Sequence, residues 1–337
     1  MKRKIIWFLL LPWLCYGCEN DDNEFFSPDF EVFVLLPAEG LGDRSFVDNI
    51  YAAIEEVKLN TNIKVNYIIP ESLEKGEAWV NQMHLLKSDI RPDCLIIIAG
   101  SQYTTAIDAL NGQFGSHSVL FFEGTAREQP NLAQIEYHTY APSYIAGYLS
   151  ALKSDTCKAI VLAGFDAPFL AEYIDGFHEG IIDAGGSYSP PAFVSTGFSG
   201  FEMPDSAYQI ALGLLESHQL IFALATGSNQ GIINAAREYI SQRYVVGVDA
   251  DQSWMGYNVV TGSIIKLYLP DVEHYIEQFR KGSFKSGNFT KTQAEGRTSF
   301  LLNPLVMKTT AIPESVLQTA IQKEAIYLIN KGTALVP

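Results

Sequence analysis

Small polar and acidic side chains follow several predicted strands in both halves of this 337-residue chain. In doubly wound parallel sheets, ligands gather at the carboxyl ends of the strands. Helix capping accounts for part of this enrichment, but its recurrence in both halves fits a cleft lined from two sides. The candidate ligand-binding residues of this kind are Asp43, Ser45, Glu123, Asn229 and Asp249, together with Gly227 of the turn that contains Asn229.

One aromatic residue, Phe46, begins a predicted helix directly after a turn that contains Gly40 and Gly42. At that position its ring can line a cleft or anchor the helix in the core, and the pattern alone supports both interpretations.

Motifs that would indicate catalysis are scarce. The chain lacks HExxH, GxSxG, GxxxxGK[ST] and GxGxxG motifs. S-x-x-K occurs at Ser150 and at Ser263, the second ending at Lys266, but the companion motifs of serine acylases are missing. The six histidines have no ligand spacing, and residues 249–252 begin like a calcium loop without its later glycine and glutamate. We therefore expect that the protein is not an enzyme and that it binds no metal and no cofactor.

Short apolar runs alternate with amphipathic stretches along the chain. The runs are continuous in valine, isoleucine, leucine and phenylalanine, which is typical of parallel strands covered on both faces. Strands are predicted at 31–36, 63–69, 94–99, 118–122, 159–162, 193–196, 220–225, 244–248 and 259–265. Helices are predicted at 46–57, 142–153, 206–215, 231–240, 272–279 and 313–329. This alternation predicts an α/β fold with parallel sheets and right-handed crossovers.

The alternation falls into two blocks, which predicts two lobes. We assign residues 30–138 and 254–337 to lobe 1 and residues 139–253 to lobe 2, with a first crossing at 137–142. The last segment is too small to fold alone, so we expect it to complete the earlier lobes by crossing more than once.

The N-terminus is typical of a secreted lipoprotein. A cationic start and an apolar run up to Leu14 predict a signal peptide at residues 1–17. Cys18 follows Gly17 as in a bacterial lipobox, although Cys15 stands where leucine is usual. We expect lipidation at Cys18, a linker over 18–29, and attachment to the cell envelope. The acidic run after Cys18 fits either a surface-export signal or a solvated tether.

The net charge argues against one class of partner, and the positions of two cysteines indicate a place in the core. The net charge is −15, from 38 acidic and 23 basic residues, so nucleic acid is not expected to bind. Cys94 and Cys157 lie in strand patterns and are expected as free core cysteines.

Several motifs, in preserved order, resemble the basic membrane protein family of solute-binding lipoproteins. Residues 42–46 resemble its D-D-K-S-F segment, 144–151 its Y-L-A-G-Y-L-A-A segment and 227–231 its G-x-x-x-G turn. Residues 247–252 are similar to its G-V-D-x-D-Q segment and 263–266 to its S-x-x-K.

This resemblance implies the type I periplasmic-binding-protein fold with three hinge crossings and a nucleoside-like, possibly purine nucleoside, ligand. It implies that Phe46 stacks on the base, that Asp249 and Lys266 hold the ribose hydroxyls, and that Glu123 adds a carboxylate. The facing aromatic residue would be Phe198 or Phe201. It further implies an ABC permease as partner of a monomeric protein.

Two departures concern the base-reading positions. Pro37 stands where the family has aspartate, and Val47 where it has asparagine. A different nucleoside, or a ligand outside that class, therefore stays open. So do two other functions, a surface capture or sensor protein without a permease and a nucleoside hydrolase.

Overall fold

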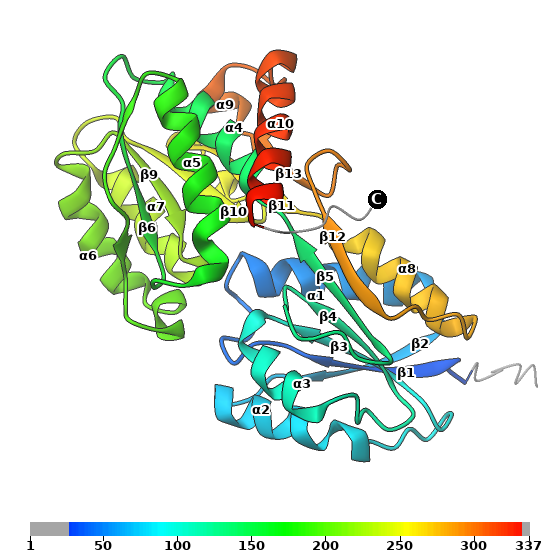
Figure 1. Cartoon of the computed structure of the whole chain (residues 1–337). Helices are drawn as coiled ribbons and strands as arrows, with labels where there is room; N and C mark the ends of the chain where they lie inside the picture. Colours follow the sequence, from blue (N-terminus) through cyan, green and yellow to red (C-terminus); the bar gives the residue numbers. More distant parts are fainter. Residues whose placement is uncertain (1–26, 332–337) are drawn as a thin grey trace, which may run out of the picture.

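The computed structural model describes residues 27–331, which form two α/β lobes (Figure 1). The first sheet has six parallel strands in the order β12-β5-β4-β3-β1-β2. The strands are β1 (Phe30–Leu35), β2 (Ile63–Ile68), β3 (Leu95–Ala99), β4 (Ser118–Phe122), β5 (Leu132–Tyr137) and β12 (Gly287–Lys291).

Helices cover both faces of this sheet because its central strands are apolar on both sides. All five residues of β3 are buried, as expected for a strand between two helical layers. One face packs against α1 (Phe46–Asn60) and α8 (Leu269–Arg280). The other face packs against α2 (Leu73–Gln82) and α3 (Thr104–Leu110).

The second sheet has the order β13-β11-β10-β9-β6-β7, with the short β8 also paired to β6. Its pairs are parallel except β11–β13. The strands are β6 (Lys158–Ala163), β7 (Ser187–Tyr188), β8 (Ala192–Phe193), β9 (Leu220–Leu224), β10 (Tyr244–Asp249), β11 (Val260–Lys266) and β13 (Thr298–Leu302).

This sheet is also covered on both faces. The helices α4 (Tyr140–Ala151), α5 (Ala171–Asp183) and α10 (Glu314–Lys331) lie on one face. The helices α6 (Pro204–Leu215) and α7 (Asn229–Glu238) lie on the other. The short α9 (Pro304–Met307) follows β13.

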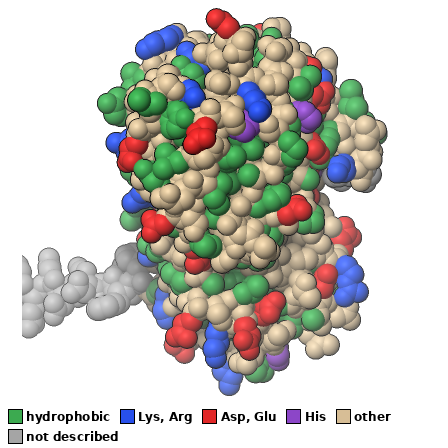
Figure 2. Space-filling view, turned by 90° about the vertical axis from the view of Figure 1, so that its left-hand side faces the viewer, with side chains coloured by type: hydrophobic (Ala, Val, Ile, Leu, Met, Phe, Trp, Pro, Cys, Tyr) green, Lys and Arg blue, Asp and Glu red, His purple; other side chains and the backbone are tan. Residues whose placement is uncertain are grey.

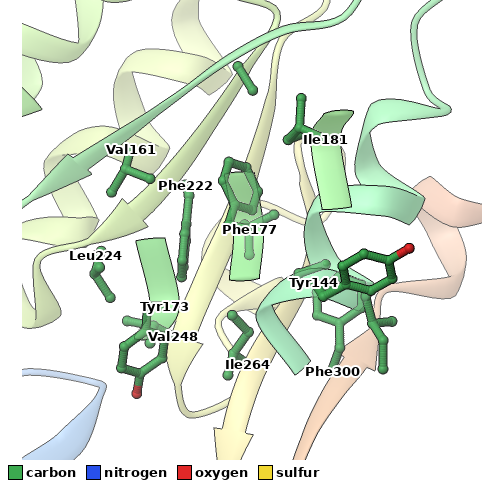
Figure 3. Packing of buried hydrophobic residues seen from close by; sticks show 14 of the residues in the cluster. Tyr144, Val161, Tyr173, Phe177, Ile181, Phe222, Leu224, Val248, Ile264 and Phe300 are labelled. Carbon is green, nitrogen blue, oxygen red and sulfur yellow. The ribbon is translucent and has the colours of Figure 1, made fainter. Parts of the chain in front are cut away.

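Glycines let α4 and α5 approach closely. A Cβ at Gly147 would overlap the carbonyl oxygen of Phe177, and one at Gly180 would overlap that of Tyr144. The helix pair buries Phe177 and Ile181 against the sheet, where Phe222 and Ile264 lie (Figure 3).

The chain passes between the lobes three times. It leaves β5 for α4 at residues 138–139, leaves β11 for α8 at 267–268, and leaves β12 for β13 at 292–297. The predicted first crossing at 137–142 therefore lies where we expected it.

One predicted boundary needs correction. Residues 254–337 were assigned to lobe 1, but β11 and β13 belong to the second sheet. Within residues 254–331, only α8 and β12 complete the first lobe. The reason is that β11 extends the second sheet beside β10, so the chain stays in lobe 2 until Lys266.

Most predicted elements are present, with shifted ends. The expected strand at 193–196 is reduced to the two-residue β8. The pattern missed β5, whose apolar run is interrupted by Gln134 and Glu136, and α5, whose buried face includes glycine. The signal peptide, Cys18 and most of the linker over 18–29 lie outside the described residues. Between residues 27 and 331, none of the helices combines the length and apolar character that a bilayer crossing requires.

Candidate functional site

A cavity of about 740 Å³ lies between the two lobes. The ends of strands and the first turns of helices in both lobes contribute to its wall, as the doubly wound topology predicts. The size is typical of a small-molecule site. Figure 2 shows one face of the molecule, on which the two lobes meet at a waist. Of the predicted site residues, the cavity is lined by Asp43, Phe46, Glu123, Phe198, Asp249 and Lys266, and Phe201, the alternative to Phe198, lines it as well.

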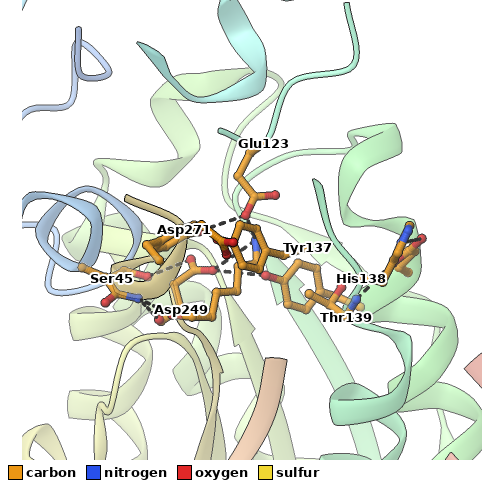
Figure 4. A network of polar contacts seen from close by, with 12 residues as sticks. Ser45, Glu123, Tyr137, His138, Thr139, Asp249 and Asp271 are labelled. Carbon is orange, nitrogen blue, oxygen red and sulfur yellow. Dashed lines mark hydrogen bonds and ion pairs between the residues drawn. The ribbon is translucent and has the colours of Figure 1, made fainter. Parts of the chain in front are cut away.

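Three charged side chains meet on the wall of the cavity. The Nζ of Lys266 lies 2.8 Å from Oε1 of Glu123 and 3.7 Å from Oδ1 of Asp249. Their side chains are 7%, 18% and 8% exposed. Glu123 follows β4 in the first lobe, and the other two end β11 and β10 in the second. This cluster therefore joins the lobes (Figure 4).

Tyrosines support the cluster on both sides. The hydroxyl of Tyr173 donates to Oδ1 of Asp249 at 3.1 Å, and that of Tyr268 donates to Oε1 of Glu123 at 2.9 Å. Burial works against the charge of Lys266, but Glu123, Tyr173 and Asp249 outweigh it and raise the pKa of the ammonium well above its usual value. The ammonium thus keeps its proton between two carboxylates.

Both carboxylates leave their strands in an uncommon backbone conformation. Glu123 has φ +61° and Asp249 has φ +66°, in the left-handed region that residues other than glycine rarely adopt. Such conformations persist where the surroundings impose them, and they concentrate at functional sites.

Ser45 and Asn49 connect α1 to the second lobe behind the cavity wall. The Oγ of Ser45 donates to Oδ2 of Asp249 at 3.1 Å and to the carbonyl of Val248 at 3.2 Å. The Nδ2 of Asn49 donates to the carbonyls of Asp249 and Lys266 at 2.6 and 3.0 Å. Ser45 is fully buried and orients Asp249 without lining the cavity itself.

Asp43 caps α1 and also faces the cavity. Its carboxylate accepts the backbone N–H groups of Ser45, Val47 and Asp48 at 3.0, 2.9 and 3.1 Å. Burial raises the pKa of Asp43 to about 6, although these three donors oppose the shift.

Aromatic rings line the cavity from both lobes. Phe46 belongs to the first lobe and contacts Tyr268 edge-on, with ring centroids 6.0 Å apart. Phe198 belongs to the second lobe, with Phe165 at 4.9 Å and Phe169 stacked at 6.2 Å.

The glycine-rich turn of the second lobe contributes differently from the prediction. Neither Gly227 nor Asn229 lines the cavity, whereas Thr226 does. A Cβ at Gly227 would lie 2.9 Å from the carbonyl oxygen of Phe201, so glycine permits the close packing of this turn. Asn229 is fully buried, and its Oδ1 accepts the N–H of Ala225 at 2.9 Å.

Several lining residues were not predicted from the sequence. Phe165 is the second residue after β6, so reading the residues after that strand would have found it. Tyr173 lies on α5, which was not predicted, and no local signal marked it. Pro37 and Val47, noted as departures, both line the cavity.

A second polar cluster lies at the first crossing. The Nδ1 of His138 lies 3.0 Å from Oε1 of Glu172, and Glu324 of α10 accepts the N–H of Ala141 at 3.0 Å (Figure 4 shows His138). Burial raises the pKa of Glu324 to about 7. Burial opposes the charge of His138, but neighbouring carboxylates, Glu172 first, raise its pKa.

The described part of the chain contains no group of three or more histidine, cysteine, aspartate or glutamate side chains that could hold a metal ion. Cys94 and Cys157 are free and buried, as expected.

Comparison with known proteins places these features in a family. A family model described as "ABC transporter substrate-binding protein PnrA-like" matches residues 30–297. Basic membrane protein D of Borreliella burgdorferi is 23% identical over 269 residues, which cover 79% of this chain and 76% of that protein. The CD4+ T-cell-stimulating antigen of Listeria monocytogenes is 25% identical over 296 residues, covering 80% of each chain. A lipoprotein of Pyrococcus furiosus is 23% identical over 282 residues, which cover 80% of this chain and 69% of that protein.

Solved structures share the fold. An ABC transporter solute-binding protein from Aeropyrum pernix has a TM-score of 0.71 at 17% identity, covering 90% of this chain and 88% of its own. A periplasmic solute-binding protein from Actinobacillus succinogenes with bound D-allose has a TM-score of 0.61 at 13% identity, and the match covers 77% of this chain and 95% of that protein. The predicted type I periplasmic-binding-protein fold is thereby confirmed.

Proposed function

We propose that this chain, which belongs to the Bmp family of PnrA-like ABC transporter substrate-binding proteins, binds a nucleoside in its interlobe cavity and delivers it to an ABC permease. The observation that carries the proposal is the buried cluster of Glu123, Asp249 and Lys266 on the wall of an aromatic-lined cavity.

The charged cluster fits a ribose diol. Two neighbouring hydroxyls can donate to carboxylates of Asp249 and Glu123 and accept from the ammonium of Lys266. Hydrogen bonds with one charged partner are shorter and stronger than neutral ones. Because the three groups already satisfy one another, their positions are fixed before the ligand arrives, which lowers the entropic cost of binding.

The aromatic residues fit a flat heterocycle. Phe46 and Phe198 reach the cavity from opposite lobes, so closure around a ring can stack it on both faces. Stacking of this kind contributes about 1–3 kcal/mol per base in single-stranded nucleic-acid complexes.

The charge of the cavity favours an uncharged ligand over a phosphorylated one. Its lining holds more carboxylates than ammonium groups, and a phosphate would have to approach them at short range. The carboxylates are Glu39, Asp43, Glu123, Glu136, Glu172 and Asp249, and the ammonium groups are Lys266 and Lys331.

Isothermal titration against ribonucleosides, their 2′-deoxy forms and their 5′-monophosphates tests this proposal. We expect heat with at least one purine ribonucleoside, weaker binding of the matched 2′-deoxynucleoside, and no binding of the monophosphate. Absence of heat with every nucleoside would remove the proposal.

Membrane attachment through Cys18 is part of the same proposal. It is supported by the lipobox-like residues before Cys18 and by relatives that are named lipoproteins. Cell fractionation and fatty-acid labelling of Cys18→Ser against the unchanged chain test it. Equal labelling and equal membrane recovery of both proteins would contradict it.

A further inference from the structure

Arg44 joins the two lobes outside the cavity. It lies in the first lobe, in the loop between β1 and α1, and between Asp43, which lines the cavity, and Ser45, which bonds Asp249. Arg44 itself is exposed and does not line the cavity. Its contacts with the second lobe therefore connect the lobes without touching a ligand in the cavity.

The side chain of Arg44 makes two contacts with the second lobe. Its Nη1 donates to Oε1 of Gln230 on α7, and its guanidinium lies over the ring of Trp254, 5.6 Å from the ring centroid. A guanidinium within about 6 Å of an indole centroid is attracted by the π-electrons of the ring. Trp254 is 64% exposed, so its ring is accessible at the surface for such a contact.

Neighbouring side chains hold both ends of this junction in place. Asp48, on the first turn of α1, accepts the N–H of Arg44 at 2.8 Å. On α7, Nε2 of Gln230 donates to Oδ1 of Asn234 one helical turn further along, at 3.0 Å, which leaves Oε1 of Gln230 for Arg44. Groups that are positioned before they meet lose little conformational entropy when they make contact.

The backbone of Arg44 belongs to the same junction. Arg44 has φ +54°, in the left-handed region that residues other than glycine rarely adopt. Its carbonyl accepts from Nε2 of Gln252 at 3.2 Å, and Gln252 is fully buried in the second lobe. Uncommon conformations persist where the surroundings impose them. Here Asp48 holds the loop from the first lobe and Gln252 from the second.

We propose that the contact of Arg44 with Gln230 and Trp254 stabilises the closed state and slows release of the ligand. Because the contact joins the lobes, opening must break it before the ligand can leave. It forms as the lobes close, after the ligand has entered, so it lowers the dissociation rate and leaves the association rate unchanged. The inference goes beyond the proposed function, since it does not depend on which solute the cavity holds.

Both partners of the Arg44 side chain are uncharged, so the loss of a positive charge elsewhere on the first lobe should not reproduce its role. Arg127→Met is the matched control. The side chain of Arg127 is 71% exposed in the first lobe and does not line the cavity.

Release kinetics of a purine ribonucleoside test the proposal. Adenosine, guanosine and inosine are titrated first, and the one that the unchanged protein binds most tightly is loaded in labelled form and chased with an excess of unlabelled nucleoside. We expect Arg44→Met and Trp254→Ala each to speed release by about 3- to 30-fold, with association rates within about twofold of those of the unchanged protein and Arg127→Met. Saturable binding shows that the variants are folded.

A double-mutant cycle separates one shared contact from two independent effects. If Arg44 and Trp254 act through each other, the variant with both substitutions releases the nucleoside no faster than Arg44→Met alone. Trp254→Phe keeps an aromatic face and should release it within about threefold of the unchanged rate. Multiplied effects in the double variant, or equal release by Arg44→Met and Arg127→Met, would overturn the proposal and leave the proposed function standing.

Trp254 also reports the contact without any ligand. Its emission is the difference between the fluorescence of each protein and that of the same protein carrying Trp254→Phe. We expect acrylamide to quench this emission more strongly in Arg44→Met than in the unchanged protein or Arg127→Met, because the guanidinium no longer covers the ring. Equal quenching in all three would overturn the contact. No binding of any nucleoside by the unchanged protein would instead overturn the proposed function.

Discussion

Lys266 is the residue on which the site depends most. Its ammonium lies between Glu123 of one lobe and Asp249 of the other, so removing it leaves two buried carboxylates facing each other. Breaking a buried ion pair on one side destabilises a protein by about 3–5 kcal/mol, because the remaining charge is uncompensated.

At the residue scale, we predict that Lys266→Met abolishes measurable nucleoside binding and lowers the free energy of unfolding at pH 7 by about 3 kcal/mol. Part of this stability should return as the pH falls and the unpaired carboxyls take up protons. Denaturant unfolding and titration calorimetry measure both effects. Lys281→Met, at a side chain that is 66% exposed, is the matched control. Equal unfolding free energies for the two variants would contradict the prediction.

At the scale of elements, helix packing holds the second lobe in shape. The helices α4 and α5 approach so closely that Gly147 and Gly180 each face a backbone carbonyl of the opposite helix. Because α5 carries Tyr173, which donates to Asp249, the spacing of these helices also positions the site.

We predict that Gly180→Ala destabilises the protein by about 1–3 kcal/mol, since a Cβ there forces the helices apart. Gly213→Ala is the control, because Gly213 lies in α6 with open space around it. It should be neutral or stabilising by up to about 1 kcal/mol, as alanine favours helix. Thermal unfolding compares the two, and a loss of the same size in both would refute the role of the close approach.

The helix α10 brings a titrating group to the first crossing. Burial raises the pKa of Glu324 from 4.5 to about 7, so the folded protein binds this proton more tightly than the unfolded chain. Its contribution to stability is complete below about pH 4.5 and is lost as the pH rises through about 7.

Glu324→Gln should therefore be more stable than the unchanged protein at pH 8 by about 1–3 kcal/mol, while the two should be close at pH 5. The amide oxygen can still accept the N–H of Ala141. Urea unfolding at both pH values measures the difference, with the exposed Glu314→Gln on the same helix as control. A difference that is independent of pH would exclude this explanation.

At the scale of the whole molecule, three crossings connect the lobes. Polar contacts at the start of α1 also hold the first lobe against the second. Besides Ser45 and Asn49, the carbonyl of Arg44 accepts from Nε2 of Gln252 at 3.2 Å. These bonds form only when the lobes are together, so they contribute to the equilibrium between open and closed states.

We predict that Asn49→Ala weakens ligand binding by about 3- to 30-fold without touching the ligand, because it removes two interlobe hydrogen bonds. Small-angle X-ray scattering should show a larger radius of gyration for this variant without ligand, and a return toward the closed value at saturating ligand. Asn60→Ala on the same helix, whose side chain bonds within α1, should behave like the unchanged protein. An unaltered scattering profile together with unaltered affinity would contradict the role of Asn49 in closure.

Patterns in the sequence were sufficient to predict the class of fold and several residues at the cavity. Continuous apolar strands alternating with amphipathic helices require a parallel sheet covered on both faces, and polar residues after such strands gather at one edge. Phe46, Glu123, Asp249 and Lys266 were therefore within reach of sequence patterns and a family resemblance, and all four line the cavity.

The folded structure was needed to establish which of these residues contact one another and which side chains support them. The contact of Glu123 with Lys266 joins strands of different sheets, Tyr173 comes from a helix that the apolar pattern did not reveal, and β11 and β13 lie in the second lobe. Local sequence patterns record the spacing of residues along one element. Charge compensation, burial and strand order depend on segments that are distant in the chain and become neighbours only when the two lobes fold.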